Sequence, residues 1–271
     1  MDQKIVFIGA GSMAEAIIAG LTKSDSLAHQ RIFVTNKSNQ DRLTYLEETY
    51  GIKQVNDKDK IISESDIVVL AMKPKDMKDA LSSIKSLIHS KQLILSVLAG
   101  TSTKAILKEI NKEVPIIRVM PNTSALIGES ATAISKGKYV EEYHMTIANK
   151  LLHTIGKTVT VEEDKMHAVT SISGSGPAYI YYLVEAMQKA AIDAGLEQDI
   201  AEQLIKQTII GVGEMLRTSS EPVHILRENI TSPEGTTEAG LNALKKHGFE
   251  KAITECVESA RKRSLELGEE E

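Results

Sequence analysis

Short apolar runs rich in β-branched residues alternate with stretches of helical periodicity through residues 1 to 162. The runs are KIVFIG (4–9), RIFVTN (31–36), DIVVLAM (66–72), LILSVLAG (93–100) and PIIRVMPN (115–122), with weaker runs at ATAIS (131–135) and TVTV (158–161). Between them, apolar residues recur at helical spacing in 12–24, 39–51, 74–88 and 102–110. This order predicts βαβ units and a buried parallel sheet.

After residue 163 the strand pattern stops, and helix follows helix. We expect helices over 177–194 (ended by Gly195), 199–217, 222–228, 236–247 (ended by Gly248) and 249–267, with Ser175 or Gly176 as the N-cap of the first. The predicted fold is therefore α/β, an N-terminal Rossmann dinucleotide-binding domain (1–162) followed by an all-α C-terminal domain (163–271).

Two glycines inside the second of these helices indicate close packing. Gly211 and Gly213 each disfavour a helix by roughly 1 kcal/mol, so another backbone is expected to pack against them. That neighbour belongs either to the same subunit or to the second subunit of an intertwined dimer.

Composition limits the classes of function. The chain has 271 residues, 42% of them hydrophobic, and a net charge of -5 with its cations spread evenly, which argues against a nucleic-acid partner. The single cysteine, Cys256, and the scattered histidines give no disulfide and no metal-ligand spacing. The N-terminal apolar run is too short for a signal peptide or a membrane span, so we expect a cytoplasmic protein.

The strongest chemical signal is the segment Gly9-Ala10-Gly11-Ser12-Met13-Ala14. It follows the first strand and opens a helix, which is the context in which GxGxxA places a dinucleotide pyrophosphate at a helix N-terminus. The ends of later strands, at Ala71-Met72-Lys73-Pro74 and at Ala99, are expected to complete the cofactor crevice. Lys73 is either a phosphate contact or an ordinary solvated lysine.

The end of the second strand bears on the choice of cofactor. NAD sites usually place an acid there, whereas this chain has Thr35-Asn36-Lys37 with Arg42 one helical turn further on. The hydroxyl, the amide and the two cations favour NADP, because they would not repel its 2′-phosphate as an acid would. Lys37 and Arg42 could also be solvated surface charges.

The chain resembles the pyrroline-5-carboxylate reductase family. The resemblance covers nearly the whole chain and rests on six segments in this order: IGAGSMAEA, AMKP, RVMPNT, VEED, SGSGPAYIY and NITSPEGTTEAGL. The resemblance implies reduction of the cyclic imine 1-pyrroline-5-carboxylate to L-proline, the last step of proline biosynthesis, with NADPH or NADH. It also implies a homo-oligomer built from dimers of the helical domain.

The resemblance also assigns roles to individual residues. The turn from Ser232 to Thr237, including Gly235 and Thr236, would hold the substrate carboxylate through main-chain N–H groups, and Asn229 and Glu163 would line the pocket. Thr237 would be the catalytic residue, its hydroxyl meeting the ring nitrogen, although a threonine in the first turn of a helix is commonly only a cap. Cofactor contacts are implied at Thr35, Ala71, Lys73 and Ala99. Hydride transfer to a protonated imine requires neither a nucleophile nor a metal.

The chain departs from the family pattern at one position, since Glu234 stands where the family usually has the first glycine of Ser-Pro-Gly-Gly. If that position requires a positive φ, glutamate costs on the order of 1 kcal/mol or more. We expect instead a type I turn, with the Glu234 side chain in solvent.

Two alternatives remain open at the level of sequence. One is an NADP-binding paralogue with a regulatory role and little turnover, for which Glu234 is the clue. The other is an oxidoreductase of the hydroxyacid dehydrogenase type, which would normally place a lysine or histidine on the helix after SGSGPAY. That helix has no lysine before Lys189.

Overall fold

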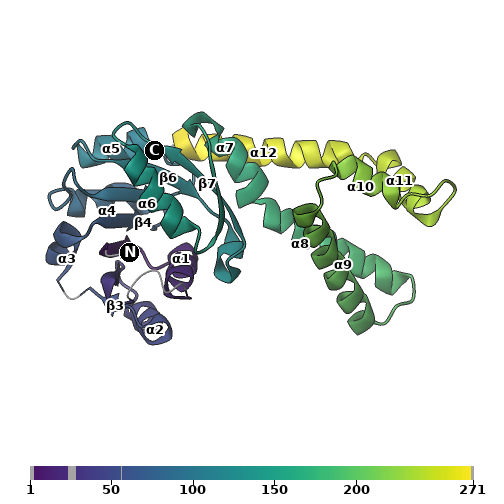
Figure 1. Cartoon of the computed structure of the whole chain (residues 1–271), viewed down its shortest axis with the longest axis horizontal. Helices are drawn as coiled ribbons and strands as arrows, with labels where there is room; N and C mark the ends of the chain where they lie inside the picture. Colours follow the sequence, from purple (N-terminus) through teal and green to yellow (C-terminus); the bar gives the residue numbers. More distant parts are fainter. Residues whose placement is uncertain (1–2, 24–28, 56, 270–271) are drawn as a thin grey trace. The chain divides into compact units, whose positions relative to one another are not determined.

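The computed structural model describes residues 3–23, 29–55 and 57–269, so Ser24 at the end of the first predicted helix lies outside it. The chain forms two compact units (Figure 1). The first comprises Met1–Pro177 with Ser259–Glu271, and the second comprises Ala178–Glu258. These units are defined by compactness, and their bounds differ from those of the predicted domains, 1–162 and 163–271. The predicted division into a cofactor-binding domain and a helical domain stays a prediction.

The first unit is built on one eight-stranded sheet in the order β3-β2-β1-β4-β5-β6-β7-β8. The strands are β1 (Ile5–Ile8), β2 (Ile32–Thr35), β3 (Lys53–Gln54), β4 (Ile67–Leu70), β5 (Leu93–Ser96), β6 (Ile116–Met120), β7 (Ser130–Lys136) and β8 (Gly156–Thr160). Neighbouring strands are parallel except β6 and β7. This arrangement confirms the predicted Rossmann sheet, and all seven predicted strands are present. The two-residue β3 was not predicted.

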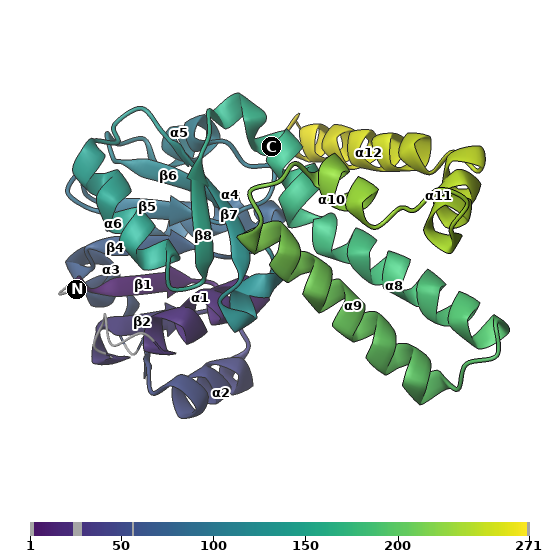
Figure 2. The same cartoon turned by 45° about the vertical axis from the view of Figure 1, so that its right-hand side comes forward.

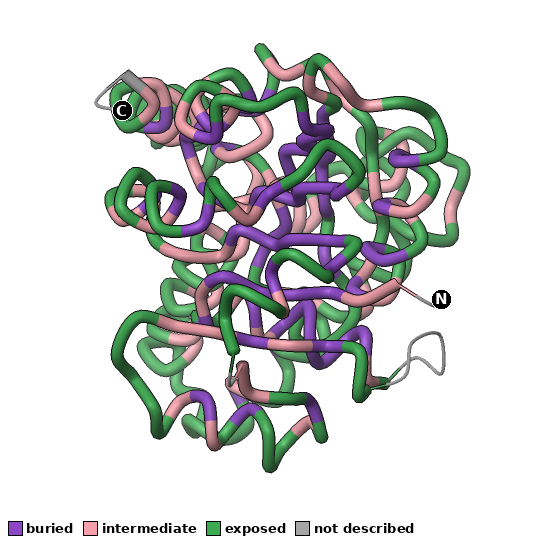
Figure 3. The backbone as a smooth tube through the Cα atoms, turned by 90° about the vertical axis from the view of Figure 1, so that its left-hand side faces the viewer, coloured by how far each residue is buried: buried purple, intermediate pink, exposed green. Residues whose placement is uncertain are grey.

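Helices cover both faces of this sheet because alternate residues of each strand point to opposite sides. Ile5 and Phe7 belong to one buried cluster, with α1 (Ser12–Lys23), α2 (Gln40–Tyr50) and α6 (Glu142–Leu152). Val6 and Ile8 belong to the other, with α3 (Lys58–Glu64), α4 (Met77–Ile84) and α5 (Thr103–Ile110). Figure 3 shows the buried segments concentrated in the strands between these layers. Helices α3 and α6 were not predicted.

The second half of the chain is helical, as predicted, and in the described residues it contains no strand after β8. Its helices are α7 (Met166–Val169), α8 (Gly176–Asp193), α9 (Gln198–Thr218), α10 (Val223–Asn229), α11 (Thr236–Lys246) and α12 (Phe249–Glu269). Helices α8 and α9 run in opposite directions around a turn at Gly195, whose φ is +95° (Figure 2).

The predicted N-cap of α8 is wrong. Ser175 has helical backbone angles, and its N–H donates to the carbonyl oxygen of Thr170 at 2.8 Å, closing a π turn over Thr170–Gly174 that leads into α8 from α7. A Cβ atom on Gly174 would lie 2.6 Å from Met120 Cε, so the turn packs tightly against the end of β6. Close packing of the preceding turn therefore decides how α8 begins.

Candidate functional site

The ends of β1, β2 and β4 are joined at Gly9. The Gly9 N–H donates to the Thr35 carbonyl oxygen at 2.8 Å, and the Ala71 N–H donates to the Ile8 carbonyl oxygen at 2.9 Å. Gly9 has a φ of +112°, and a Cβ atom there would lie 2.5 Å from the Ala71 carbonyl oxygen. Only glycine fits such a position, because any side chain would collide with the β4 backbone.

Helix α1 begins beside this junction. Its first hydrogen bond runs from the Glu15 N–H to the Gly11 carbonyl oxygen at 3.0 Å, and Gly11 and Ser12 are exposed. The N–H groups of the first turn have no acceptor within the helix and carry a partial positive charge, which suits a pyrophosphate. Ala10 and Ala14 are buried, so their side chains are not available to a ligand.

Arg42, whose position after β2 favours a contact with the adenosine phosphate, is bound to two other groups in the structure. Its Nε donates to the Ala10 carbonyl oxygen at 2.9 Å, and its guanidinium pairs with the Glu15 carboxylate. Burial opposes ionisation of Glu15, but hydrogen bonds from Arg42 and Tyr50 outweigh burial and lower the pKa of Glu15. Arg42 therefore holds the glycine loop onto α1 from behind.

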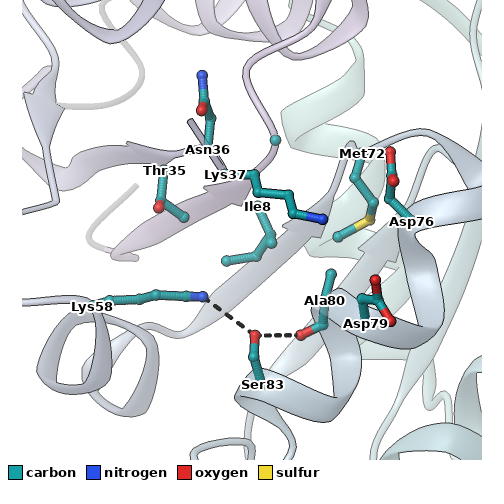
Figure 4. Close-up of a pocket in the computed structure, with 11 residues that line it drawn as sticks. Ile8, Thr35, Asn36, Lys37, Lys58, Met72, Asp76, Asp79, Ala80 and Ser83 are labelled. Carbon is teal, nitrogen blue, oxygen red and sulfur yellow. Dashed lines mark hydrogen bonds between the residues drawn. The ribbon is translucent and has the colours of Figure 1, made fainter. Parts of the chain in front are cut away.

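A cavity of about 320 Å³ opens at the carboxyl ends of β1, β2 and β4 (Figure 4). Five of its lining residues were predicted to contact the cofactor: Gly9, Thr35, Asn36, Lys37 and Met72. The others are Ile8, Lys58, Asp76, Asp79, Ala80 and Ser83. Lys58 was missed because it is the first residue of α3, a helix whose seven residues gave no clear periodicity.

Other predicted cofactor residues lie at strand ends outside the lining of this cavity. Lys73 is exposed, and its carbonyl oxygen accepts from the Asp76 N–H at 2.9 Å. Pro74 begins a 3₁₀ turn before α4, and Ala99 is half-buried beyond β5. Their cofactor contacts stay predictions, together with those of Ser12, Met13 and Ala71.

Glu163 lies in the first unit and is engaged by two hydrogen bonds. The Thr103 N–H and hydroxyl donate to its two carboxylate oxygens, each at 2.7 Å, so Glu163 caps the start of α5. Arg118, which is only 3% exposed, approaches Glu163 Oε1 at 3.7 Å through Nη1. The sequence analysis assigned no role to Arg118. An arginine inside an apolar strand stands out from its neighbours, but the local sequence does not show that its partner is Glu163.

His167 lies next to this pair and contacts the C-terminal helix. Its Nδ1 is 3.0 Å from the Ser264 hydroxyl of α12, and burial together with the Arg118 guanidinium lowers the pKa of His167. The same end of α12 packs on the loop beyond β5, since a Cβ atom on Gly268 would lie 2.8 Å from the Gly100 carbonyl oxygen. The last turns of the chain thus support the strand-end loop that contains Ala99.

In the second unit, the turn before α11 differs from the type I turn that we predicted. The Gly235 N–H donates to the Ser232 carbonyl oxygen at 3.0 Å, and Glu234 has a φ of +58°. A type I turn requires a negative φ at this third position, whereas a type II turn requires a positive one. Glu234 is exposed, as expected, but its backbone occupies the region that favours glycine.

Helix α11 begins at this turn, with Gly235 as its N-cap and Thr236 and Thr237 as its first residues. A Cβ atom on Gly235 would lie 2.5 Å from Ser232 Oγ and 3.0 Å from the Ser232 carbonyl oxygen, so a side chain there would require the Ser232 hydroxyl to move. The Glu238 carboxylate accepts from the Glu234 N–H at 2.8 Å. Asn229 ends α10 and is exposed. The structure thus places Asn229 and residues 232–237 in one unit and Glu163 in the other.

Neither a membrane-spanning helix nor a metal-ligand cluster occurs among the described residues. No helix within them is long and apolar enough to cross a membrane. No three histidine, cysteine, aspartate or glutamate side chains in that part of the chain are grouped as metal ligands would be.

Replacing Arg42 by methionine tests its role behind the glycine loop. Methionine keeps much of the apolar stem but removes the bonds to Ala10 and Glu15, so we expect the free energy of unfolding to fall by about 1–3 kcal/mol. Affinities for NADPH and NADH, measured by fluorescence titration, should weaken by the same factor. A much larger loss for NADPH would show that Arg42 contacts the 2′-phosphate instead.

The lowered pKa of His167 predicts a pH dependence of stability. Below about pH 6.5 the unfolded chain takes up this proton before the folded chain does, so the free energy of unfolding falls with pH until the folded pKa is reached. Denaturant unfolding at several pH values between 5 and 8 should show a shallower fall for His167→Gln, with His153→Gln at an exposed site as the control. Equal slopes for His167→Gln and the wild type would contradict this assignment.

Comparison with known protein families divides the chain into two matched parts. Residues 4–100 match the family described as NADP oxidoreductase coenzyme F420-dependent. Residues 163–267 match the family described as pyrroline-5-carboxylate reductase dimerisation. The predicted order of a dinucleotide-binding part and a helical part agrees with both matches.

Individual relatives match over nearly the whole chain. Pyrroline-5-carboxylate reductase 1 of Bacillus subtilis (strain 168) is 49% identical over 269 residues, which cover 99% of this chain and 91% of that protein. The structure of a pyrroline-5-carboxylate reductase from Coxiella burnetii superposes with a TM-score of 0.91 at 33% identity, covering 98% of this chain and 99% of that one. The NADP-bound pyrroline carboxylate reductase of Plasmodium falciparum gives a TM-score of 0.89 at 29% identity, covering 98% of each chain. The resemblance seen in the sequence is confirmed, and the chain belongs to the pyrroline-5-carboxylate reductase family.

Proposed function

We propose that this chain reduces 1-pyrroline-5-carboxylate to L-proline, with NADPH as the preferred hydride donor and NADH as a second one. The observation that carries the proposal is the fit of Gly9 against Ala71, which leaves the start of α1 open to a pyrophosphate, in a chain 49% identical to a named reductase. The NADP-bound Plasmodium falciparum relative supports the same cofactor.

The residues present suit a bound nicotinamide dinucleotide. Gly9 supplies the close main-chain approach, Gly11 to Met13 supply the N–H groups, and Thr35 and Asn36 line the cavity at the end of β2. When bound, the cofactor supplies the hydride that adds to the imine carbon. The chain's own part is to hold both reactants and to keep the ring nitrogen protonated.

On this proposal the substrate carboxylate lies at the start of α11. The N–H groups of residues 235–237 belong to the N-cap and first turn of that helix, where an anion is stabilised. The Thr237 hydroxyl meets the ring nitrogen and orients the imine. Asn229 and Ser232 complete the pocket, and the pocket role that the resemblance gives Glu163 stays a prediction.

We further propose that the chain works as a homo-oligomer built from dimers. Tyr182 is 75% exposed, Ile210 is 58% exposed and Val212 is 53% exposed. Beyond the adjoining residues and the surrounding backbone of α9, no heavy atom of the described chain lies within 4 Å of a Cβ atom added to Gly211 or Gly213. A second copy covering α8 and α9 would bury these apolar side chains and supply the backbone neighbour that the two glycines predict. A cytoplasmic location and the lack of a nucleic-acid partner remain part of the proposal.

A regulatory paralogue with little turnover is the second candidate, favoured by the positive φ of Glu234. That conformation costs a non-glycine residue on the order of 1 kcal/mol. A strained glutamate at the proposed carboxylate site would be tolerated more readily in a protein that does not turn over.

The activity and the role of Thr237 are tested together by NADPH oxidation with 1-pyrroline-5-carboxylate. We expect turnover by the wild type and a loss of about 10- to 100-fold in kcat/KM for Thr237→Ala, the range for a lost hydrogen bond to a charged group. Thr237→Ser keeps the hydroxyl and should keep most of the activity. Full activity of the alanine variant would remove Thr237 from the mechanism.

Glu234→Gly separates the reductase from the regulatory paralogue. If the chain is the enzyme, the wild type turns over, and the glycine variant lowers KM for the imine by about fivefold at most, since two exposed charges 4 Å apart repel by only about 1 kcal/mol in water. Glu234→Gln removes the charge but keeps the backbone constraint. No wild-type rate together with rescue by Glu234→Gly would instead identify the paralogue.

A further inference from the structure

Two lysines from different elements meet at the cavity that opens beyond β2. Lys37 lies just beyond the end of β2 at Thr35, and Lys58 is the first residue of α3. Figure 4 shows the Lys37 ammonium extending toward the side of Met72 and Asp76, whereas the Lys58 ammonium turns toward Ser83. The segment between these lysines crosses α2 and β3, so the sequence alone does not show that they share one cavity.

The Lys58 ammonium contacts a neutral group, the Ser83 hydroxyl. Its Nζ donates to the Ser83 hydroxyl at 3.3 Å, and that hydroxyl donates to the Ala80 carbonyl oxygen at 2.8 Å. None of the ion pairs found among the described residues includes Lys58. Its charge is therefore oriented at the cavity wall without being neutralised by a carboxylate.

The cation that the sequence offered for this task is occupied elsewhere. Arg42 is bound to the Ala10 carbonyl oxygen and the Glu15 carboxylate, and it does not line the cavity. Thr35 and Asn36 carry no charge, so Lys37 and Lys58 are the cations that this cavity presents. Asp76 ends the 3₁₀ turn before α4 and Asp79 lies in α4, so neither acid is at the end of β2, where an acid would bind the ribose hydroxyls of NAD.

We propose that Lys58 determines cofactor specificity by binding, together with Lys37, the 2′-phosphate of NADPH. The proposal rests on the proposed function, because it assigns the adenosine end of the same cofactor site. A phosphate monoester carries nearly two negative charges at neutral pH and accepts several charge-assisted hydrogen bonds, which matches two ammonium groups approaching from separate elements. NADH has no 2′-phosphate and would gain nothing comparable from Lys58.

The test compares Lys58→Ala with Lys60→Ala, which removes the same charge from the same helix. Lys60 is exposed and does not line the cavity, and the contact of its main-chain N–H with Asp57 is kept in the variant. We expect the ratio of kcat/KM for NADPH to that for NADH to fall about tenfold in Lys58→Ala. The ratio should stay at the wild-type value in Lys60→Ala and recover in Lys58→Arg.

Calorimetric titration of the full chain with 2′,5′-ADP and 5′-ADP gives a readout that needs no turnover. We expect the wild type to prefer 2′,5′-ADP and Lys58→Ala to lose about tenfold of that preference, while Lys60→Ala retains it. Equal loss in both variants, or no loss in Lys58→Ala, overturns the proposal. If the wild type fails to reduce the imine but shows this titration pattern, the proposed reaction fails while the role of Lys58 stands.

Discussion

The fold depends on the contact between Gly9 and the β4 backbone at Ala71. Gly9 has a φ of +112° and no side chain, so the chain can pass in close contact with the β4 backbone as it leaves β1. The Gly9 N–H donates to the Thr35 carbonyl oxygen at the end of β2. That junction directs the first turn of α1 toward the carboxyl edge of the sheet, where the strand order reverses between β1 and β4. Arg42 connects the same loop to α1 through its hydrogen bonds to Ala10 and Glu15.

The start of α11 is also positioned by a tight turn that contains a glycine. There the Ser232 carbonyl oxygen closes the turn, and a Cβ atom added to Gly235 would crowd the Ser232 hydroxyl. Glu238 accepts from the Glu234 N–H, so an internal carboxylate already satisfies one main-chain donor beside the proposed substrate site. Both proposed ligands are anionic at the relevant end. On the proposed function, main-chain amides at two helix starts would each hold one of these anionic groups.

The sequence predicted the sheet and most of the helices because long apolar runs and glycine-ended helices are local signals. Local signals failed where tertiary contacts decide the outcome. Lys53–Gln54 is too short to show a strand period, and α3 has only seven residues. The sequence analysis singled out Arg42 and not Lys58, because only the folded chain brings Arg42 to Ala10 and Lys58 to Ser83. The positive φ of Glu234 was not predicted, because a residue with a side chain rarely adopts a positive φ.

A crystal structure of the full chain grown with NADP⁺ and L-proline tests the central claim most directly. We expect the pyrophosphate at the N–H groups of residues 11–13 and the proline carboxylate at the N–H groups of residues 235–237. Well-ordered proline bound through side chains elsewhere, or a dinucleotide whose phosphates do not meet the start of α1, would contradict it.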